Sequence, residues 1–279
     1  MNENKYYLPL GRSLNFELDN YVEELKKAEN LGFYSIDFDL CNFWRSPAEV
    51  EREKYEMIEE RLDLLKASKL VLNGVHISFG PRWDPSAVDE KEREENCARI
   101  REIFKRIDPY KPRCYVLHGS SHPFDPDRKG NLAVLKESVL ALSEHTDGVI
   151  CLETQPRRGS LYSSEEACEV ADWFAERTEK VKICIDVNHI LEEKSEDVVL
   201  RLGKHIFTTH ISDHDYIDEK HWLPGKGKID WMKLLESFEK IGYKGVFNYE
   251  VWAESADMKA NYDAMFGWYN EIRVKKSSP

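Results

Sequence analysis

The 279-residue sequence lacks two features that define broad classes of protein. No run approaches the roughly 18–20 consecutive apolar residues that a membrane-spanning helix needs, so we expect no membrane partner. Basic residues are too few for a protein that coats nucleic acid, because 40 Lys and Arg stand against 52 Asp and Glu. The net charge of −12 therefore leads us to expect no nucleic-acid partner.

Signals of a secreted or disulfide-bonded protein are also scarce. Residues 1–5 are polar and are followed by no apolar signal-peptide core. The six cysteines contain no C-x-x-C pair and no regular framework, and Cys114, Cys151 and Cys184 lie in apolar segments where free thiols are ordinary. We therefore expect a cytoplasmic protein with unpaired thiols.

Short apolar segments rich in β-branched and aromatic residues recur at a mean spacing of about 35 residues, the length of a βα unit. Helical patterns separate them: Asn20–Leu31 ends before Gly32, and Ser163-x-x-Glu166 has the form of a capping box. No Gly-rich phosphate loop follows an early segment, which argues against an open doubly wound sheet. The pattern predicts a single (β/α)8 TIM barrel domain over residues 1–279. The predicted strands are Tyr6–Leu10, Tyr34–Leu40, Val71–Phe79, Cys114–His118, Gly148–Glu153, Lys182–Asp186, His205–Ile211 and Gly245–Trp252.

Ionisable side chains stand at the ends of the last four predicted strands, where a buried parallel strand is otherwise apolar. The C-terminal ends of barrel strands meet at one face, where barrel enzymes build their sites. Three carboxylates brought together there need a positive partner, and with one imidazole they suit Mn²⁺, Mg²⁺, Co²⁺ or Zn²⁺. Any single carboxylate could instead accept hydrogen bonds from a loop or cap a helix. The four residues are Glu153, Asp186, His210 and Glu250.

Other polar and aromatic residues sit near the same strand ends. His76 and His118 hold similar places in the third and fourth predicted strands, and His189 follows Asp186 by three residues. Each histidine could contact substrate or be an ordinary hydrogen-bonded residue. Trp252 offers an apolar ring to the C–H face of a sugar, although rim contacts explain it equally well. The glycines and lysines of Pro224–Trp231 could meet an anion, with a plain turn as the alternative.

Six short motifs occur in a characteristic order along the chain. They are Gly32–Asp37, Leu152–Thr154, Cys184–His189, Thr209–Asp213, Pro224–Trp231 and Tyr249–Glu250. Together they resemble the xylose isomerase-like TIM barrel superfamily, in particular sugar and sugar-phosphate isomerases and ketose 3-epimerases. The family's second strand often carries an acid where Asp37 stands here.

The resemblance implies a ligand set, because four such positions bind Mn²⁺ or a similar ion in ketose 3-epimerases. Carried over, the metal ligands are Glu153, Asp186, His210 and Glu250, and the two glutamates also act as acid and base. One departure concerns substrate anchoring: those epimerases often have an arginine shortly after the metal-binding histidine, where Tyr216 falls here. The predicted substrate contacts are His189, His76, His118, Asp37 and Trp252.

The predicted function is a divalent-metal-dependent isomerase or epimerase of a small-molecule sugar or sugar phosphate. It removes a proton beside a carbonyl through a metal-stabilised enediolate. One alternative is an endonuclease IV-like enzyme with three zinc ions, for which His221 extends the partial match, although Glu219 stands where the nuclease pattern has an Asp. A dehydratase or lyase using the same proton removal is another, and a non-catalytic sugar-binding barrel is a third. Related barrels are often dimers or tetramers, so a homo-oligomer is possible.

Overall fold

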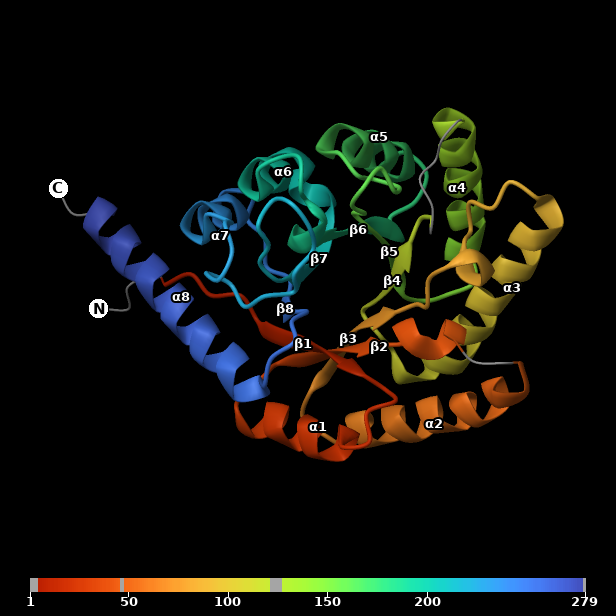
Figure 1. Cartoon of the computed structure of the whole chain (residues 1–279), viewed down its shortest axis with the longest axis horizontal. Coiled ribbons are helices and arrows are strands. Elements are labelled where there is room, and N and C mark those ends of the chain that lie inside the picture. The colour runs from red at the N-terminus through yellow and green to blue at the C-terminus, as the bar shows by residue number, and fades with distance from the viewer. Residues whose placement is uncertain (1–4, 46–47, 121–126, 278–279) are drawn as a thin grey trace.

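Eight parallel strands close into a barrel in this computed structural model, which describes residues 5–45, 48–120 and 127–277. Each strand pairs with the next one along the chain, and β1 closes the barrel against β8 (Figure 1). The predicted (β/α)8 fold is therefore confirmed. The strands are β1 Leu10–Asn15, β2 Ser35–Asp39, β3 Val71–His76, β4 Cys114–His118, β5 Val149–Glu153, β6 Val181–Asp186, β7 Ile206–Ile211 and β8 Phe247–Tyr249.

Eight α-helices alternate with the strands and surround the barrel (Figure 1). Their starts follow local capping chemistry: Ser163 and Asp230 accept backbone hydrogen bonds from Glu166 and Lys233, which leaves fewer unsatisfied N–H groups in the first turn. None of the described helices is long and apolar enough to cross a bilayer. The helices are α1 Tyr21–Asn30, α2 Ala48–Lys66, α3 Glu90–Ile107, α4 Arg128–Ser143, α5 Ser164–Ala175, α6 Ser195–Leu202, α7 Trp231–Lys240 and α8 Ser255–Ser277.

The first strand differs from its predicted position. It runs over Leu10–Asn15 and not over Tyr6–Leu10, with Gly11 opposite Ser35 of β2. Of the residues that suggested a strand, Tyr6 and Leu8 are buried and Tyr7 is half-exposed, and Tyr6 N donates to Asn270 Oδ1 of α8 at 2.8 Å. The true strand carries Arg12 and Asn15, which belong to the mouth of the barrel. Because these side chains are polar, a search for apolar runs does not identify this strand.

Cysteine thiols fill part of the barrel interior, and they are buried and unpaired as predicted. Cys114, Cys151 and Cys184 are fully buried and form a small cluster with Val116. All six cysteines of the chain are free. On the outer face of the barrel, aromatic rings pack between the strands and the helices. The ring centroids of Phe104 in α3 and Tyr115 in β4, for example, lie 4.5 Å apart.

One buried carboxylate organises the loop between β7 and α7. Asp213 Oδ2 accepts hydrogen bonds from Gly225 N at 2.8 Å, Gly227 N at 2.9 Å and Trp231 Nε1 at 2.9 Å. Its Oδ1 accepts from Ile229 N at 3.2 Å. The backbone N–H groups of both glycines are therefore satisfied within the protein, which supports the alternative of a structural turn for them, while Lys226 and Lys228 are exposed.

We expect Asp213→Ala to lower the free energy of unfolding by about 3 kcal/mol, because it leaves several poorly solvated N–H groups without an acceptor. Urea denaturation measures the change. The matched control is Glu271→Ala on the exposed face of α8, which should change stability by less than about 0.5 kcal/mol. Equal stability of the two variants would contradict the role assigned to Asp213.

Candidate metal centre

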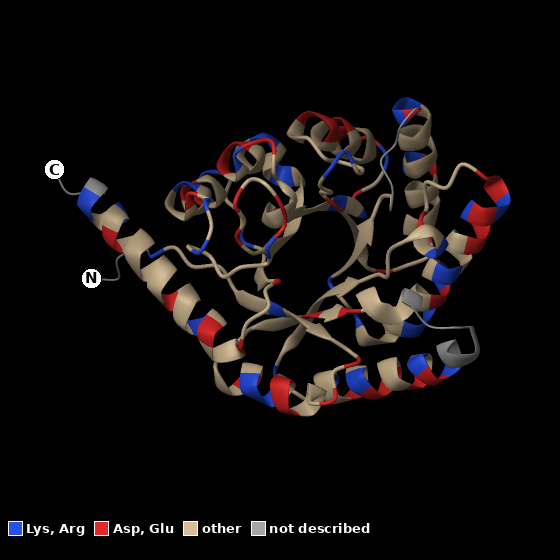
Figure 2. Ribbon diagram, in the orientation of Figure 1, with Lys and Arg blue, Asp and Glu red and all other residues tan. Residues whose placement is uncertain are grey.

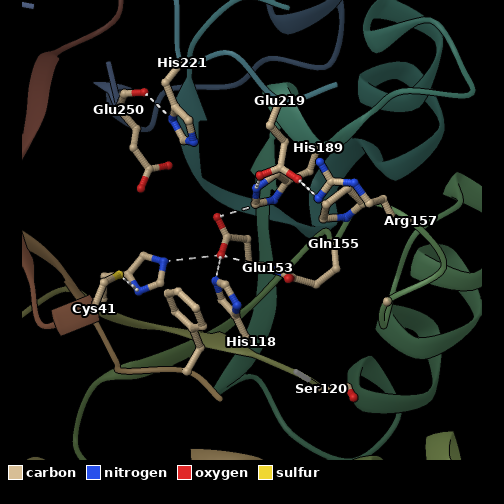
Figure 3. Close-up of a pocket in the computed structure, with 14 residues that line it drawn as sticks. Cys41, His118, Ser120, Glu153, Gln155, Arg157, His189, Glu219, His221 and Glu250 are labelled. Carbon is tan, nitrogen blue, oxygen red and sulfur yellow. Dashed lines mark hydrogen bonds and ion pairs between the residues drawn. The ribbon is translucent and has the colours of Figure 1, made fainter. Parts of the chain in front are cut away.

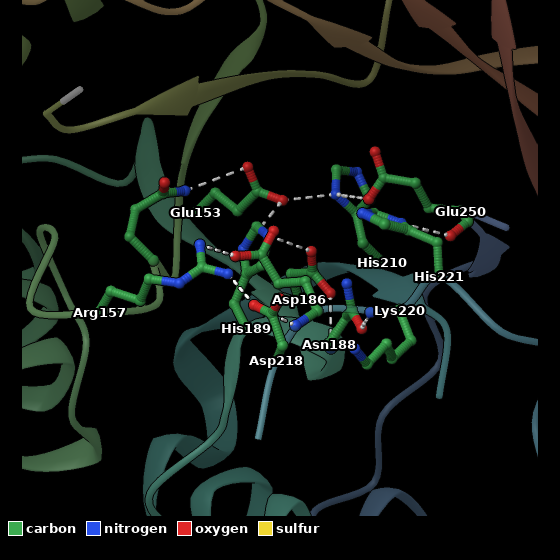
Figure 4. Close-up of polar contacts among 12 residues, drawn as sticks. Glu153, Arg157, Asp186, Asn188, His189, His210, Asp218, Lys220, His221 and Glu250 are labelled. Carbon is green, nitrogen blue, oxygen red and sulfur yellow. Dashed lines mark hydrogen bonds and ion pairs between the residues drawn. The ribbon is translucent and has the colours of Figure 1, made fainter. Parts of the chain in front are cut away.

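Four side chains from neighbouring strands converge at the C-terminal mouth of the barrel (Figure 4). Each offers one ligand atom, and these atoms all lie within 4.8 Å of one another. The imidazole is central: His210 Nδ1 lies 2.7 Å from Glu153 Oε1 and 3.1 Å from Glu250 Oε2. The strand register explains the convergence, since Asp186 is directly opposite His210. The group consists of Glu153, Asp186, His210 and Glu250, the residues proposed from the sequence.

Burial makes the three carboxylates of this cluster electrostatically costly to keep together. Burial raises the pKa of Asp186 to about 7; His189 opposes the rise, and Glu250 and Glu153 add to it. Burial also opposes ionisation of Glu250, but the neighbouring His210 imidazolium outweighs it and lowers the carboxyl pKa to about 2. For Glu153, His118 and His210 likewise overcome burial and hold its pKa well below the usual range. The cluster is thus anionic and depends on nearby positive charge.

Two further histidines are oriented towards these carboxylates by the backbone. His76 Nδ1 contacts Ile77 O at 2.9 Å, and His189 Nδ1 contacts Thr154 O at 2.8 Å, which identifies both as N–H donors. Each Nε2 therefore faces the site: that of His76 lies 3.3 Å from Glu153 Oε2, and that of His189 lies 3.1 Å from Asp186 Oδ2.

The local carboxylates favour protonation of these rings. Burial lowers the pKa of His76 and of His189, but hydrogen bonding to Glu153 in the first case and the charge of Asp186 in the second outweigh it. The pKa values rise to about 9 and about 10. A divalent cation answers the same need for positive charge, and three carboxylates with one imidazole are a suitable donor set for it.

Asp37 lies behind the metal-ligand candidates. Its side chain is 1% exposed, and its Oδ2 lies 3.6 Å from Nε2 of His210, on the side of the ring away from the carboxylates. Asn73 Nδ2 and Gly74 N donate to its Oδ1 at 2.7 and 3.0 Å. The substrate contact predicted for Asp37 does not fit this position, because the His210 ring lies between Asp37 and the carboxylates of Glu153 and Glu250. The position fits a residue that orients the imidazole.

A cavity of about 450 Å³ opens over the cluster (Figure 3). Predicted residues on its wall are His76, His118, Glu153, His189 and Glu250. His118 Nε2 lies 2.6 Å from Glu153 Oε2, so a third imidazole reaches the same carboxylate. Trp252 does not line this cavity; it is 86% exposed and its ring stacks on His221 with centroids 5.3 Å apart.

Loop residues that the sequence did not single out complete the wall. Cys41 follows β2, and Gln155 and Arg157 follow β5. Arg157 Nη1 pairs with Glu219 Oε1 at 2.6 Å, and Glu219 Oε2 lies 3.6 Å from His189 Nε2. Arg157 thus brings a guanidinium to the cavity wall from the segment after β5, while Tyr216 stands where those epimerases often have an arginine. Neither periodicity nor strand-end position marks such residues in the sequence.

Comparisons with known proteins identify the family to which this barrel belongs. Residues 25–272 match the family described as the xylose isomerase-like TIM barrel, and the chain belongs to that family. The resemblance predicted from the six motifs is confirmed at this level.

Individual relatives are distant. A protein of Ruminiclostridium cellulolyticum named D-psicose 3-epimerase is 26% identical over 190 residues, which are 62% of each chain. The matched segments cover 63% and 62% of the lengths of two curated relatives, so the chain spans less than two thirds of each.

Solved structures extend the similarity over nearly the whole chain. D-psicose 3-epimerase with D-tagatose, from Clostridium cellulolyticum H10, aligns with a TM-score of 0.73 at 18% identity and covers 95% of this chain and 99% of that one. The IOLI protein with a bound zinc atom has the same TM-score and coverage at 13% identity. At such identities these likenesses establish the fold.

We expect Mn²⁺ at about 100 times its Kd to stabilise the protein by about 2.7 kcal/mol, which raises Tm by roughly 5–10 °C for a chain of this size. Differential scanning calorimetry after chelation and Mn²⁺ addition measures the shift. Asp186→Asn should lose most of it, whereas the control Asp257→Asn, exposed on α8, should retain it. An equal shift in both variants would place the ion elsewhere.

Proposed function

We propose that the protein is a divalent-metal-dependent sugar isomerase or epimerase. The observation that carries the proposal is a pair of glutamates, Glu153 and Glu250, that line one cavity and contact the same His210 nitrogen. Both carboxyls have lowered pKa values, so both are ionised and able to accept a proton near neutral pH. A cavity with two carboxylate bases and neighbouring imidazoles suits proton transfer at a carbon beside a carbonyl.

The metal ion would be held by Glu153, Asp186, His210 and Glu250, and Mn²⁺ is the ion we expect. When bound, it supplies positive charge that stabilises negative charge developing on substrate oxygens. Asp37 would keep the His210 ring in its orientation from behind. The zinc atom in the IOLI protein supports metal binding in this fold, without deciding the ion.

The chain's own residues divide the proton transfer between them. One glutamate, ionised, removes the proton beside the carbonyl, and the other, after taking up a proton from water or a neighbouring imidazolium, gives it to the opposite face, which inverts that carbon. Return to the neighbouring carbon would isomerise the sugar instead. His189, His118 and His76 present nitrogens to the cavity at which substrate hydroxyl groups can be bound. The likeness to a D-psicose 3-epimerase supports a ketose as substrate.

Glu250→Gln should reduce exchange of solvent deuterium into a ketose substrate by about 10²–10⁴-fold, since an amide cannot act as the base. Proton NMR in D₂O follows the exchange at the carbon beside the carbonyl. Glu254→Gln is the matched control, because Glu254 lies only four residues away but is exposed. Full exchange in Glu250→Gln would remove Glu250 from the mechanism.

A second candidate function follows from the extra histidines. His76 and His118 both direct Nε2 towards Glu153 Oε2, while His189 lies between Asp186 and Glu219. These groups could hold more than one zinc ion, as a phosphodiester-cleaving enzyme requires. The charge balance favours the sugar enzyme, because Asp and Glu outnumber Lys and Arg by 52 to 40. Basic residues are interspersed with acidic ones on α2, and α5 carries acidic residues without Lys or Arg (Figure 2).

Metal stoichiometry and DNA cleavage discriminate between the two candidates. The sugar enzyme predicts about one ion per chain after Mn²⁺ or Zn²⁺ loading and no cleavage of duplex DNA containing an abasic site. Plasma mass spectrometry and gel assays provide the two readouts. About three zinc ions per chain together with cleavage would favour the nuclease, and under about 0.1 ion per chain would favour a non-catalytic barrel, since ligands of this charge should retain an ion.

A further inference from the structure

A second cavity of about 500 Å³ lies beside the one over the metal-ligand candidates. The two cavities share His221 and Glu250, which form the boundary between them. Each is of the size, roughly 300–1,000 Å³, that ordinarily holds a small ligand. The mouth of the barrel therefore offers more room than the reacting part of one sugar needs. The remaining wall of the second cavity comes largely from the end of β1, the end of β2 and the segment after β8.

Hydrogen-bonding groups on this wall are held in place by one another. Asn15 Nδ2 donates to Asp39 Oδ2 at 3.0 Å, and Asp39 Oδ1 accepts from Cys41 N at 2.6 Å. Asn42 and Ser13 add an amide and a hydroxyl group. Fixed amides and carboxylates of this kind bind ligand hydroxyl groups without a large ordering cost.

An aromatic ring stands at the edge of the same cavity. The Trp252 side chain is 86% exposed and stacks on the boundary residue His221. A large apolar ring held in solvent by a neighbouring ring offers a flat face for the C–H side of a sugar. Leu18, in the segment that follows β1, adds a small apolar surface to the wall.

Charge excludes an anionic ligand from the second cavity. Arg12 is the one cation on the described wall, and it is already committed: its Nη1 pairs with Glu24 Oε2 at 3.0 Å and also donates to Ser255 Oγ. Against it stand Asp39 and Glu250, while the charge of Glu17 is paired with Lys54, whose Nζ lies 2.6 Å from Glu17 Oε1. A phosphate group would meet more negative than positive charge here, whereas a neutral, hydroxyl-rich group meets acceptors and donors.

We propose that the second cavity binds a second sugar ring, so that the substrate is a ketose carrying a neutral glycosyl substituent. This inference rests on the proposed function, which places the reacting ketose over the metal-ligand candidates. Glu250 would then stand at the junction of the two rings, and the glycosyl ring would lie between Asn15, Asp39 and Trp252.

Binding measurements on the Mn²⁺-loaded protein test the inference without relying on turnover. The probes are the keto-disaccharides isomaltulose, lactulose and turanose, with D-fructose and D-fructose 6-phosphate for comparison. Isothermal titration calorimetry should give at least one disaccharide a Kd about tenfold or more below that of D-fructose, and D-fructose 6-phosphate should bind more weakly than D-fructose. A Kd for D-fructose equal to or below that of every disaccharide overturns the inference.

Two variants locate the glycosyl ring. Leu18→Trp narrows the second cavity, and Trp252→Ala removes its aromatic face. Each should reduce the preference for the favoured disaccharide over D-fructose about tenfold, and the control Trp268→Ala, exposed on α8, should preserve it. A preference that survives both variants, or falls equally in the control, overturns this placement.

The outcome separates this inference from the proposed function. Deuterium exchange into D-fructose without any preference for a disaccharide would sustain the proposed function and overturn the inference. Selective disaccharide binding without exchange into any sugar would sustain the second cavity as a glycosyl site and overturn the isomerase. Absence of both binding and exchange would overturn both.

Discussion

The mouth of this barrel is governed by the cost of holding three carboxylates within a few ångströms in a buried site. Glu153, Asp186 and Glu250 cannot all ionise there without positive charge close by, and that need explains why imidazoles surround them. His210 lies at the centre because its Nδ1 reaches both glutamates. A divalent ion satisfies the same need with a single charge centre. The carboxylates would then remain ionised, which general base catalysis requires.

The rest of the fold serves to fix this cluster. Parallel pairing around a closed barrel brings the ends of β5 to β8 to one rim, so residues far apart in sequence become neighbours. Behind the rim, Asp37 is held by Asn73 and faces the far side of the His210 ring. Beyond it, Asp213 accepts hydrogen bonds from backbone N–H groups of the loop that leads into α7. Buried carboxylates thus have structural roles alongside their proposed chemical ones.

The sequence allowed the barrel and the convergence of the four ligand candidates to be predicted, because buried parallel strands are apolar runs and a charged end interrupts that pattern visibly. The same rule failed at β1, where Arg12 and Asn15 face the mouth and the apolar residues before them contact α8. The substrate contact predicted for Asp37 came from the resemblance to the family's second strand, and such a motif does not reveal on which side of His210 a side chain lies. Arg157 and the second cavity depend on loops from different parts of the chain, and no local pattern encodes their meeting.

The central claim is that one divalent ion neutralises this carboxylate cluster. Anomalous diffraction from crystals of the Mn²⁺-loaded protein, collected on both sides of the manganese absorption edge, tests it most directly. The account predicts one strong manganese peak about 2.0–2.3 Å from ligand atoms of Glu153, Asp186, His210 and Glu250. A cluster without a peak, or a peak bound by other residues while these carboxylates stay paired with histidines, would contradict it.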